Sequence, residues 1–245
     1  MNGTERRWSL RVLKLVTAMV MLVTIVAGSP AGGSVDVENA GGPKKLVILG
    51  ASYAKSWGTP PLPGFAVVNR GVGGEQTAAM RARFQRDVVS ARPDVVLIWG
   101  HINNITQSGA ATAPDRAAAV KASAREDYAS MLEQARAAGI EVILATEIPL
   151  AEPDGLVDQA RALLGRLRGK ESYAAKVNAQ VRDLNAFVRQ QAGREGFRLL
   201  DFELVFAPAG GARKSEYATE DRSHVTPAGY RALTDYAVRE LSRRR

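Results

Sequence analysis

Residues 46–53 read Leu46-Val47-Ile48-Leu49-Gly50-Ala51-Ser52-Tyr53, an apolar run that ends in a short loop carrying a serine. Four consecutive apolar residues of this kind are typical of a strand buried on both faces of a parallel sheet. Further runs of similar composition follow at Phe65–Asn69, Val95–Trp99, Val142–Ala145 and Phe197–Leu200. The chain therefore has the pattern of a five-stranded parallel sheet.

Helical segments separate these strands. Apolar residues recur at helical spacing in Glu75–Ala91, Ala113–Ala138 and Tyr173–Gln191, and the stripe of the third segment consists of Val177, Val181, Leu184 and Val188. A final helix begins at Thr226-Pro227, because threonine suits the N-cap and proline the first helical position. The alternation predicts one α/β domain, a three-layer α/β/α sandwich that binds ligands at the carboxyl ends of its strands.

The N-terminal segment has the features of an export signal. Four basic residues, the last of them Lys14, precede an uncharged apolar run from Leu15 to Ala27. That run has 13 residues, whereas a helix that spans a bilayer needs about 20. A basic start, a short apolar centre and the small residues Ser29-Pro30-Ala31 match a cleavable leader. Arg6-Arg7 loosely resembles a twin-arginine signal, and an ordinary Sec signal is the alternative.

These features divide the chain into three parts. We expect residues 1–31 to be a signal peptide or N-terminal anchor, residues 32–43 a linker rich in small residues, and residues 44–245 the folded domain. The protein is accordingly expected to be exported, either periplasmic or secreted. Any membrane contact would be made through the N-terminal segment if it stays uncleaved.

Composition excludes several kinds of function. The sequence contains no cysteine, which rules out disulfides, thiolate metal sites and a cysteine nucleophile. The net charge of +8 includes +3 from the leader, and the remaining basic residues alternate with acidic ones along helical faces. No stripe of interleaved aromatic and basic residues is present, so nucleic-acid binding is not expected.

Polar residues follow each of the first three predicted strands. Ser52 stands after the first strand, a glycine-rich loop ending in Gly73-Gly74-Glu75 after the second, and Gly100-His101-Ile102-Asn103-Asn104 after the third. The carboxyl ends of parallel strands meet at one edge of a sheet. A serine hydroxyl, free backbone N–H groups and an asparagine amide can then surround one carbonyl oxygen.

The chain also carries a possible general base close to an acid. A serine hydroxyl is a poor nucleophile unless a base removes its proton. His224 is one of only two histidines, and Asp221 lies three residues before it, within reach to hold the imidazole in one tautomer. His101, the other histidine, has no acid close by in sequence. We expect His101 to be structural or to line the substrate site.

Taken in order, these blocks resemble the SGNH (GDSL-type) hydrolase family over nearly all of residues 44–245. Ser52 matches the family nucleophile, Gly74 and Asn103 match the oxyanion-hole donors, and Asp221 and His224 match the acid and base. The resemblance implies the flavodoxin-like SGNH hydrolase fold. It also implies an exported serine esterase that cleaves carboxylic esters, short acyl groups and O-acetyl groups of carbohydrates among them, through an acyl-serine intermediate. The expected partner is a small-molecule or carbohydrate ester, with no cofactor and no metal.

Two departures from the family pattern affect the expected site. Ala51 stands where an aspartate usually precedes the serine, so the hydrogen bonds of that carboxylate are missing. The third block has one extra residue after Gly100, which leaves Asn104 as an alternative to Asn103. The Ala51 substitution keeps open a second function, a degenerate, non-catalytic SGNH-like domain that binds envelope carbohydrate.

Two other interpretations of these loops are weaker. An α/β-hydrolase elbow needs Gly-x-Ser-x-Gly, and residues 50–54 lack the second glycine. A dinucleotide loop needs a third glycine where Gln76 stands. The segment Glu152–Lys170 has no strong periodicity and is a candidate for an excursion that faces the substrate.

Overall fold

The structure is a computed structural model that describes residues 42–152, 155, 160, 164–165, 168–207 and 213–243. All of these residues belong to one of the two compact units of the chain, Gly41–Arg245. The expected leader and nearly all of the expected linker lie outside the described residues, as does much of the segment Glu152–Lys170. In the described part of the chain, no helix is both long and apolar enough to cross a bilayer.

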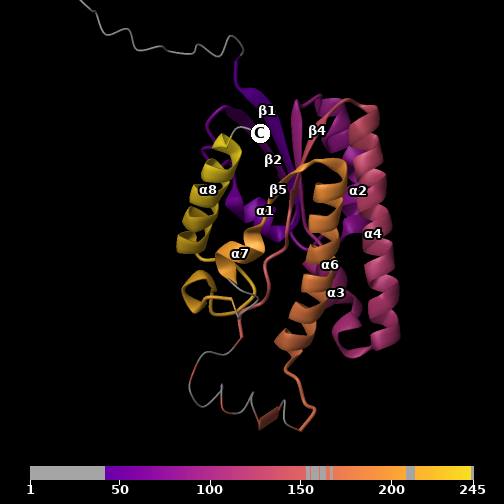
Figure 1. The fold of residues 1–245 in the computed structure, drawn as a ribbon, viewed down its shortest axis with the longest axis vertical. Coiled ribbons are helices and arrows are strands. Elements are labelled where there is room, and N and C mark those ends of the chain that lie inside the picture. Colours follow the sequence, from indigo (N-terminus) through magenta and orange to yellow (C-terminus); the bar gives the residue numbers. More distant parts are fainter. Residues whose placement is uncertain are drawn as a thin grey trace, which may run out of the picture. The chain divides into compact units, whose positions relative to one another are not determined.

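The core of the domain is a five-stranded sheet in which all neighbouring strands are parallel (Figure 1). The strand order is β2-β1-β3-β4-β5. The strands are β1 (Lys44–Gly50), β2 (Phe65–Gly71), β3 (Val95–Trp99), β4 (Glu141–Ala145) and β5 (Arg198–Leu200). This is the flavodoxin-like order of a doubly wound sheet, and it confirms the predicted fold class.

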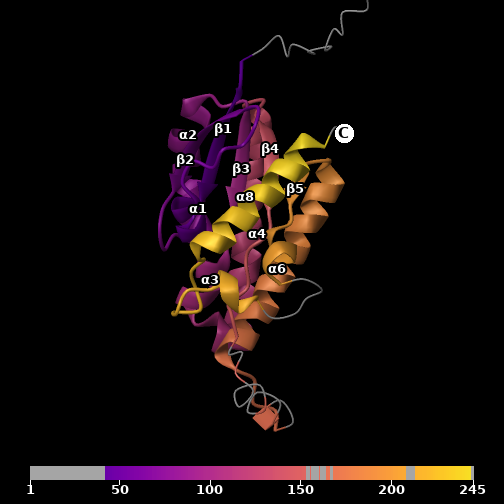
Figure 2. The same ribbon diagram turned by 90° about the vertical axis from the view of Figure 1, so that its left-hand side faces the viewer.

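Helices cover both faces of the sheet. The α-helices with described bounds are α1 (Ser52–Trp57), α2 (Thr77–Asp87), α3 (Ile102–Ser108), α4 (Pro114–Ala137), α6 (Tyr173–Glu195), α7 (Phe202–Phe206) and α8 (Pro227–Ser242). Figure 2 views the domain from the side of α8, with the strands behind it. Helices α1, α7 and α8 pack into one hydrophobic cluster and α2 into the other, whereas α4 and α6 contribute to both.

Alternation along β1 explains why both faces need a helical layer. Leu46 and Ile48 point into the cluster with α1 and α8, whereas Val47 and Leu49 point into the cluster with α2 and α4. Successive side chains of a strand project to opposite faces, so a continuous apolar run buries itself only between two layers. All four of these side chains are fully buried.

The predicted helices are confirmed with small changes at their ends. The segment predicted over Glu75–Ala91 forms α2 and then, after Val88, a 3₁₀ turn at Val89–Ala91. The predicted apolar stripe of α6 is buried along its whole length. Thr226 caps α8 through its side chain, which accepts a hydrogen bond of 3.2 Å from the Gly229 N–H. The short helices α1, α3 and α7 were not predicted.

Candidate active site

Ser52 is the first residue of α1, directly beyond the carboxyl end of β1. As the first helical residue, its backbone N–H has no acceptor within the helix. A glycine lets α1 approach the neighbouring strand, because a Cβ at Gly71 would lie 2.2 Å from the backbone nitrogen of Lys55. Ala51 occupies the N-cap and gives the helix no side-chain hydrogen bond. Helix α1 is therefore positioned by packing against the strand ends and not by a cap.

Asp221 and His224 form a hydrogen-bonded pair in the loop before α8. The imidazole Nδ1 lies 2.6 Å from Asp221 Oδ2. Asp221 Oδ1 accepts hydrogen bonds from the backbone N–H groups of Ser223 and His224, at 2.8 and 2.9 Å, and from the Thr219 hydroxyl at 2.7 Å. The contact with the His224 side chain is the largest influence that holds the pKa of Asp221 well below its usual range.

The ionised Asp221 fixes the tautomer of His224. A carboxylate is only an acceptor, so Nδ1 must carry the proton of the hydrogen bond between them. In the neutral imidazole, Nε2 is then an unprotonated acceptor, as a general base requires. Both side chains are about half exposed, so Nε2 can be reached from solvent.

Side-chain hydrogen bonds to backbone carbonyls hold the histidine loop against the serine helix. Tyr53, the neighbour of Ser52, donates from its hydroxyl to the Ser223 carbonyl at 2.6 Å. The buried guanidinium of Arg213 donates to the same carbonyl at 2.8 Å and to the His224 carbonyl at 2.7 Å. The structure thus brings the Ser52 and His224 segments together, although the two side chains form no hydrogen bond with each other. Catalytic hydrogen bonds are often long before substrate binds.

The glycine-rich loop and the start of α3 lie side by side. Asn103 donates from its amide to the Glu75 carbonyl at 2.9 Å, and Gln107 donates to the Gly74 carbonyl at 2.8 Å. Gly74 has φ +79°, a conformation that residues with side chains rarely adopt. One proton of the Asn103 amide is used by this contact, which leaves the second for another acceptor.

Asn104 has a different environment from Asn103. Its side chain is buried, accepts from the Thr77 N–H at 3.0 Å and donates to the Thr77 hydroxyl at 2.8 Å. Thr77 is the first residue of α2, so the Asn104 amide satisfies a backbone donor that the helix leaves free. Each amide keeps one proton outside these contacts, but Asn104 is buried whereas Asn103 is only partly buried, so Asn103 is the one whose remaining donor can face a substrate.

His101 is buried within the domain and does not resemble a general base. Its side chain is 1% exposed, and Nδ1 lies 3.4 Å from the Tyr128 hydroxyl. Burial lowers the pKa of His101 to about 4. These contacts agree with the structural role that the sequence suggested.

Burial of His101 is expected to weaken the fold in acid. Its pKa is about 4 in the folded protein and near 6.5 in an unfolded chain. The unfolded state therefore binds the proton more readily, and stability from this group, complete above pH 6.5, is lost as the pH falls towards 4. A shift of this size corresponds to about 3 kcal/mol. The free energy of unfolding in urea should fall less between pH 7 and pH 4.5 for His101→Phe than for the wild type. An equal fall in both proteins would contradict this role of His101.

A cavity of about 490 Å³ lies beside the acid–base loop. It is lined by Thr106, Leu150, Ala151, Ser172, Tyr173, Ala174, Asp221, Arg222 and Ser223. Its walls thus combine apolar side chains, hydroxyl groups and the exposed ring of Tyr173. Within the described ranges, we find no group of three or more acidic or histidine side chains that could hold a metal ion.

Comparison with known proteins agrees with this fold. The chain is 33% identical to the uncharacterized lipoprotein YqeF of Bacillus subtilis over 166 residues, which cover 66% of this chain and 65% of that protein. A GDSL-like lipase from Bacteroides thetaiotaomicron superposes with a TM-score of 0.57 and 21% identity, covering 81% of this chain and 89% of the other.

A second solved structure resembles the chain to a similar degree. An acetylxylan esterase from Geobacillus stearothermophilus superposes with a TM-score of 0.56 and 18% identity, covering 83% of this chain and 96% of the other. The model of the GDSL-like lipase/acylhydrolase family matches residues 34–232. Since that match spans most of the sequence, the chain belongs to the GDSL-like lipase/acylhydrolase family, a family of carboxylic ester hydrolases.

Proposed function

We propose that this protein is an exported serine esterase that removes short acyl groups, among them O-acetyl groups of carbohydrates. The observation that carries the proposal is the 2.6 Å contact between Asp221 and His224, in a loop bound to the neighbour of Ser52. An acid, a base with a free Nε2 and a serine at the carboxyl edge of one sheet are the groups that acyl transfer to serine needs.

The reaction would proceed in two steps. Ser52 Oγ attacks the ester carbonyl while His224 Nε2 takes its proton, and the tetrahedral intermediate collapses as the imidazolium protonates the departing alcohol. Water then attacks the acyl-serine with the same base, which releases the acid and restores the hydroxyl. Asp221 keeps the imidazole oriented throughout and stabilises its charged form.

Three donors would hold the oxyanion in both steps. These are the backbone N–H groups of Ser52 and Gly74 and the remaining amide proton of Asn103. Donors fixed before the reaction stabilise the developing charge without reorganising, and the loss of one costs about 3–4 kcal/mol. The contacts of Asn103 and Gln107 with the glycine-rich loop supply that rigidity.

Replacement of the two asparagines should separate catalysis from stability. We expect Asn103→Ala to lower kcat by roughly 10²–10³, because one oxyanion donor is lost. We expect Asn104→Ala mainly to lower the free energy of unfolding, by about 1–3 kcal/mol, because the Thr77 N–H stays buried without a partner. Ester assays and urea unfolding of both variants check this. The assignment fails if Asn104→Ala loses kcat while Asn103→Ala keeps it.

The substrate class is supported by the cavity and the comparisons. The cavity next to Asp221 offers an aromatic ring and hydroxyl groups, which suit a sugar or small alcohol. The Geobacillus protein of similar fold is an acetylxylan esterase. Export is supported by the basic and apolar pattern of residues 6–27 and by the relative named as a lipoprotein. A lipid linked to cysteine is not part of the proposal, because this sequence has no cysteine.

A panel of esters tests the proposal. Purified protein should release p-nitrophenol from the acetate faster than from the butyrate or octanoate, and acetate from acetylated xylan. Preference for the octanoate would contradict the short-acyl assignment. The absence of turnover on every ester, together with binding to acetylated xylan, would favour the non-catalytic carbohydrate-binding alternative, which the uncapped Ala51 position keeps open.

A further inference from the structure

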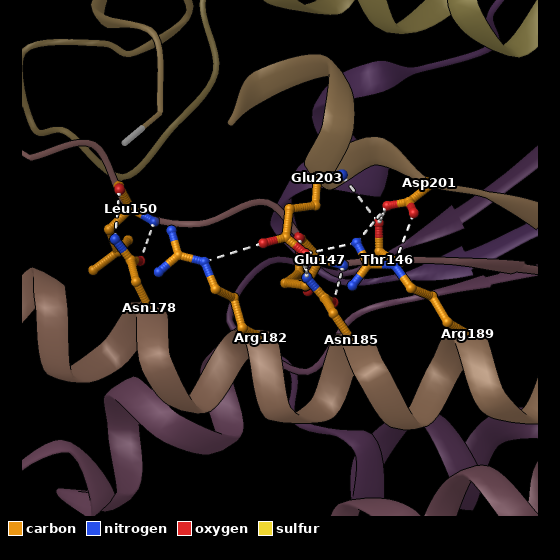
Figure 3. A network of polar contacts seen from close by, with 9 residues as sticks. All are labelled: Thr146, Glu147, Leu150, Asn178, Arg182, Asn185, Arg189, Asp201 and Glu203. Atoms are coloured by element: carbon orange, nitrogen blue, oxygen red, sulfur yellow. Dashed lines mark hydrogen bonds and ion pairs between the residues drawn. The ribbon is translucent and has the colours of Figure 1, made fainter. Parts of the chain in front are cut away.

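The segment that follows β4 is bound to α6 by two buried asparagine side chains. Asn185 accepts from the Glu147 N–H at 2.6 Å and donates to its carbonyl at 2.9 Å. Asn178 does the same for Leu150, at 2.7 and 3.0 Å. Both amides are fully buried and lie seven residues apart, on one face of the helix. Residues 146–151, which we call the β4–α6 strut, are therefore held at both of these points (Figure 3).

An ion-pair cluster fixes one of these asparagines. Asn185 also donates to Glu203 Oε2 at 2.9 Å, and Arg189 donates to the same oxygen at 2.7 Å. Arg189 further forms two contacts of 2.7 Å with Asp201. Figure 3 shows Asn178, Asn185 and Arg189 projecting from α6 towards the strut and the start of α7. The orientation of the Asn185 amide, and with it the position of Glu147, is thus set by charged partners.

Glu147 points from the strut to the loop that carries the oxyanion asparagine. Its side chain is 1% exposed, and Oε2 accepts from the backbone N–H groups of His101 at 2.8 Å and Ile102 at 3.3 Å. Oε1 accepts from the Ile148 N–H at 3.2 Å. His101 is the N-cap of α3 and Ile102 is its first residue, so they lie two positions and one position before Asn103. Burial of a carboxyl group costs free energy unless hydrogen bonds compensate for the lost water. Here two of those hydrogen bonds come from the start of α3, the helix that carries Asn103.

The other end of the strut reaches the acid–base loop. The Ala151 N–H donates to the Arg222 carbonyl at 2.9 Å. Arg222 has φ +58°, and it lies between Asp221 and His224 in the chain. One short segment therefore contacts both the α3 start and the loop that carries the base.

We propose that Glu147 is a positioning residue that sets the place of the Asn103 amide by holding the backbone of His101 and Ile102. The proposal rests on the proposed esterase function, in which Asn103 binds the oxyanion. A donor that is displaced by about 1 Å can cost about 10² in rate while substrate still binds. Loss of Glu147 should therefore reduce kcat more than it changes KM.

The test compares two substitutions in the full-length protein. Glu147→Met keeps the volume of the side chain but removes its acceptors, and Glu147→Gln keeps one acceptor oxygen for the α3 start. With p-nitrophenyl acetate we expect Glu147→Met to lower kcat by about 10- to 100-fold, with KM within about threefold, and Glu147→Gln to regain most of that loss. If Glu147→Met does not fold, Glu147→Asp shortens the reach by one methylene and should show the same kcat loss.

Asp94→Ala is the matched control. Asp94 also accepts a backbone N–H, that of Lys45 at 2.7 Å, but at the opposite end of the sheet, so its loss should leave kcat unchanged. Hydrogen exchange gives a readout without catalysis: residues 101–108 should exchange faster in Glu147→Met, and residues 44–50 should not. If the wild type is active and folded Glu147→Met has the wild-type kcat, the proposal is overturned. It is also overturned if the kcat of Glu147→Gln is no higher than that of Glu147→Met. An inactive wild type with the expected exchange pattern contradicts the esterase function and leaves the loop-holding contact supported.

Discussion

Replacement of Ser52 by alanine is expected to abolish ester hydrolysis. Removal of the serine of a serine triad lowers kcat by as much as about 10⁶, because the acyl-serine route is lost as a whole. With p-nitrophenyl acetate, only the residual rate supported by the remaining oxyanion donors, about 10³–10⁴ above spontaneous hydrolysis, should be left. The Ser52 side chain is only half buried at the start of a short helix, so the substitution should leave the melting temperature nearly unchanged.

The same helix offers a matched control. Ser56 lies four residues further along α1 and is exposed, so Ser56→Ala repeats the chemical change one turn away. It should keep the wild-type kcat. A fluorophosphonate probe should add its mass to the peptide that contains Ser52 in the wild type and in Ser56→Ala, but not in Ser52→Ala. Labelling of another serine, or full activity in Ser52→Ala, would remove Ser52 from the mechanism.

Much of the fold follows from local sequence. The strand at Val95–Trp99 is buried at every position, and a run of five large apolar residues has few other stable environments in an α/β domain. The long helices carry a repeated apolar stripe, and α8 has a strong start signal in Thr226-Pro227. The short helix α1 has neither a repeated stripe nor a side-chain cap. It forms because Tyr53 and Trp57 pack against Trp99, at 5.9 Å between ring centroids in each pair.

The candidate site was less predictable than the fold. The Asp221–His224 contact is local, so a three-residue spacing suffices to suggest it. The choice between Asn103 and Asn104 depends on Thr77, which lies 27 residues from Asn104 in the chain. Arg213 and Glu147 act through backbone groups of distant loops. Such contacts leave no spacing pattern, because a backbone N–H or carbonyl is available at almost every residue.

The buried amides of α6 show the same limit. Asn178 and Asn185 lie next to the apolar stripe, where the sequence alone suggests polar residues at the edge of a buried face. Their role is visible only in the three-dimensional structure, in which each amide forms hydrogen bonds with the backbone N–H and carbonyl of one residue of the strut. The sequence thus predicts which faces are buried, whereas three-dimensional packing decides which polar groups are needed inside them.

Substitution of His224 by glutamine is the second change expected to have a very large effect. Glutamine can still donate a hydrogen bond to Asp221, but its amide cannot take a proton from Ser52. The loss in kcat should approach that of Ser52→Ala, because nucleophile and base act as one unit and their losses do not add. The double variant Ser52→Ala, His224→Gln should therefore be no slower than either single variant. Steady-state assays of the three proteins measure this, and additive losses would argue against a shared step.

Asp221→Asn gives a graded version of the same test. The asparagine oxygen can keep the backbone contacts of Ser223 and His224, so the turn should survive. An amide directed at Nδ1 favours the tautomer with its proton on Nε2, which cannot accept from serine, and the expected loss in kcat is about 10⁴. The wild-type contact with His224 keeps the pKa of Asp221 well below its usual range, so Asp221 stays ionised wherever esters are assayed. Steady-state assays of Asp221→Asn measure this, and a kcat equal to that of the wild type would remove Asp221 from the mechanism.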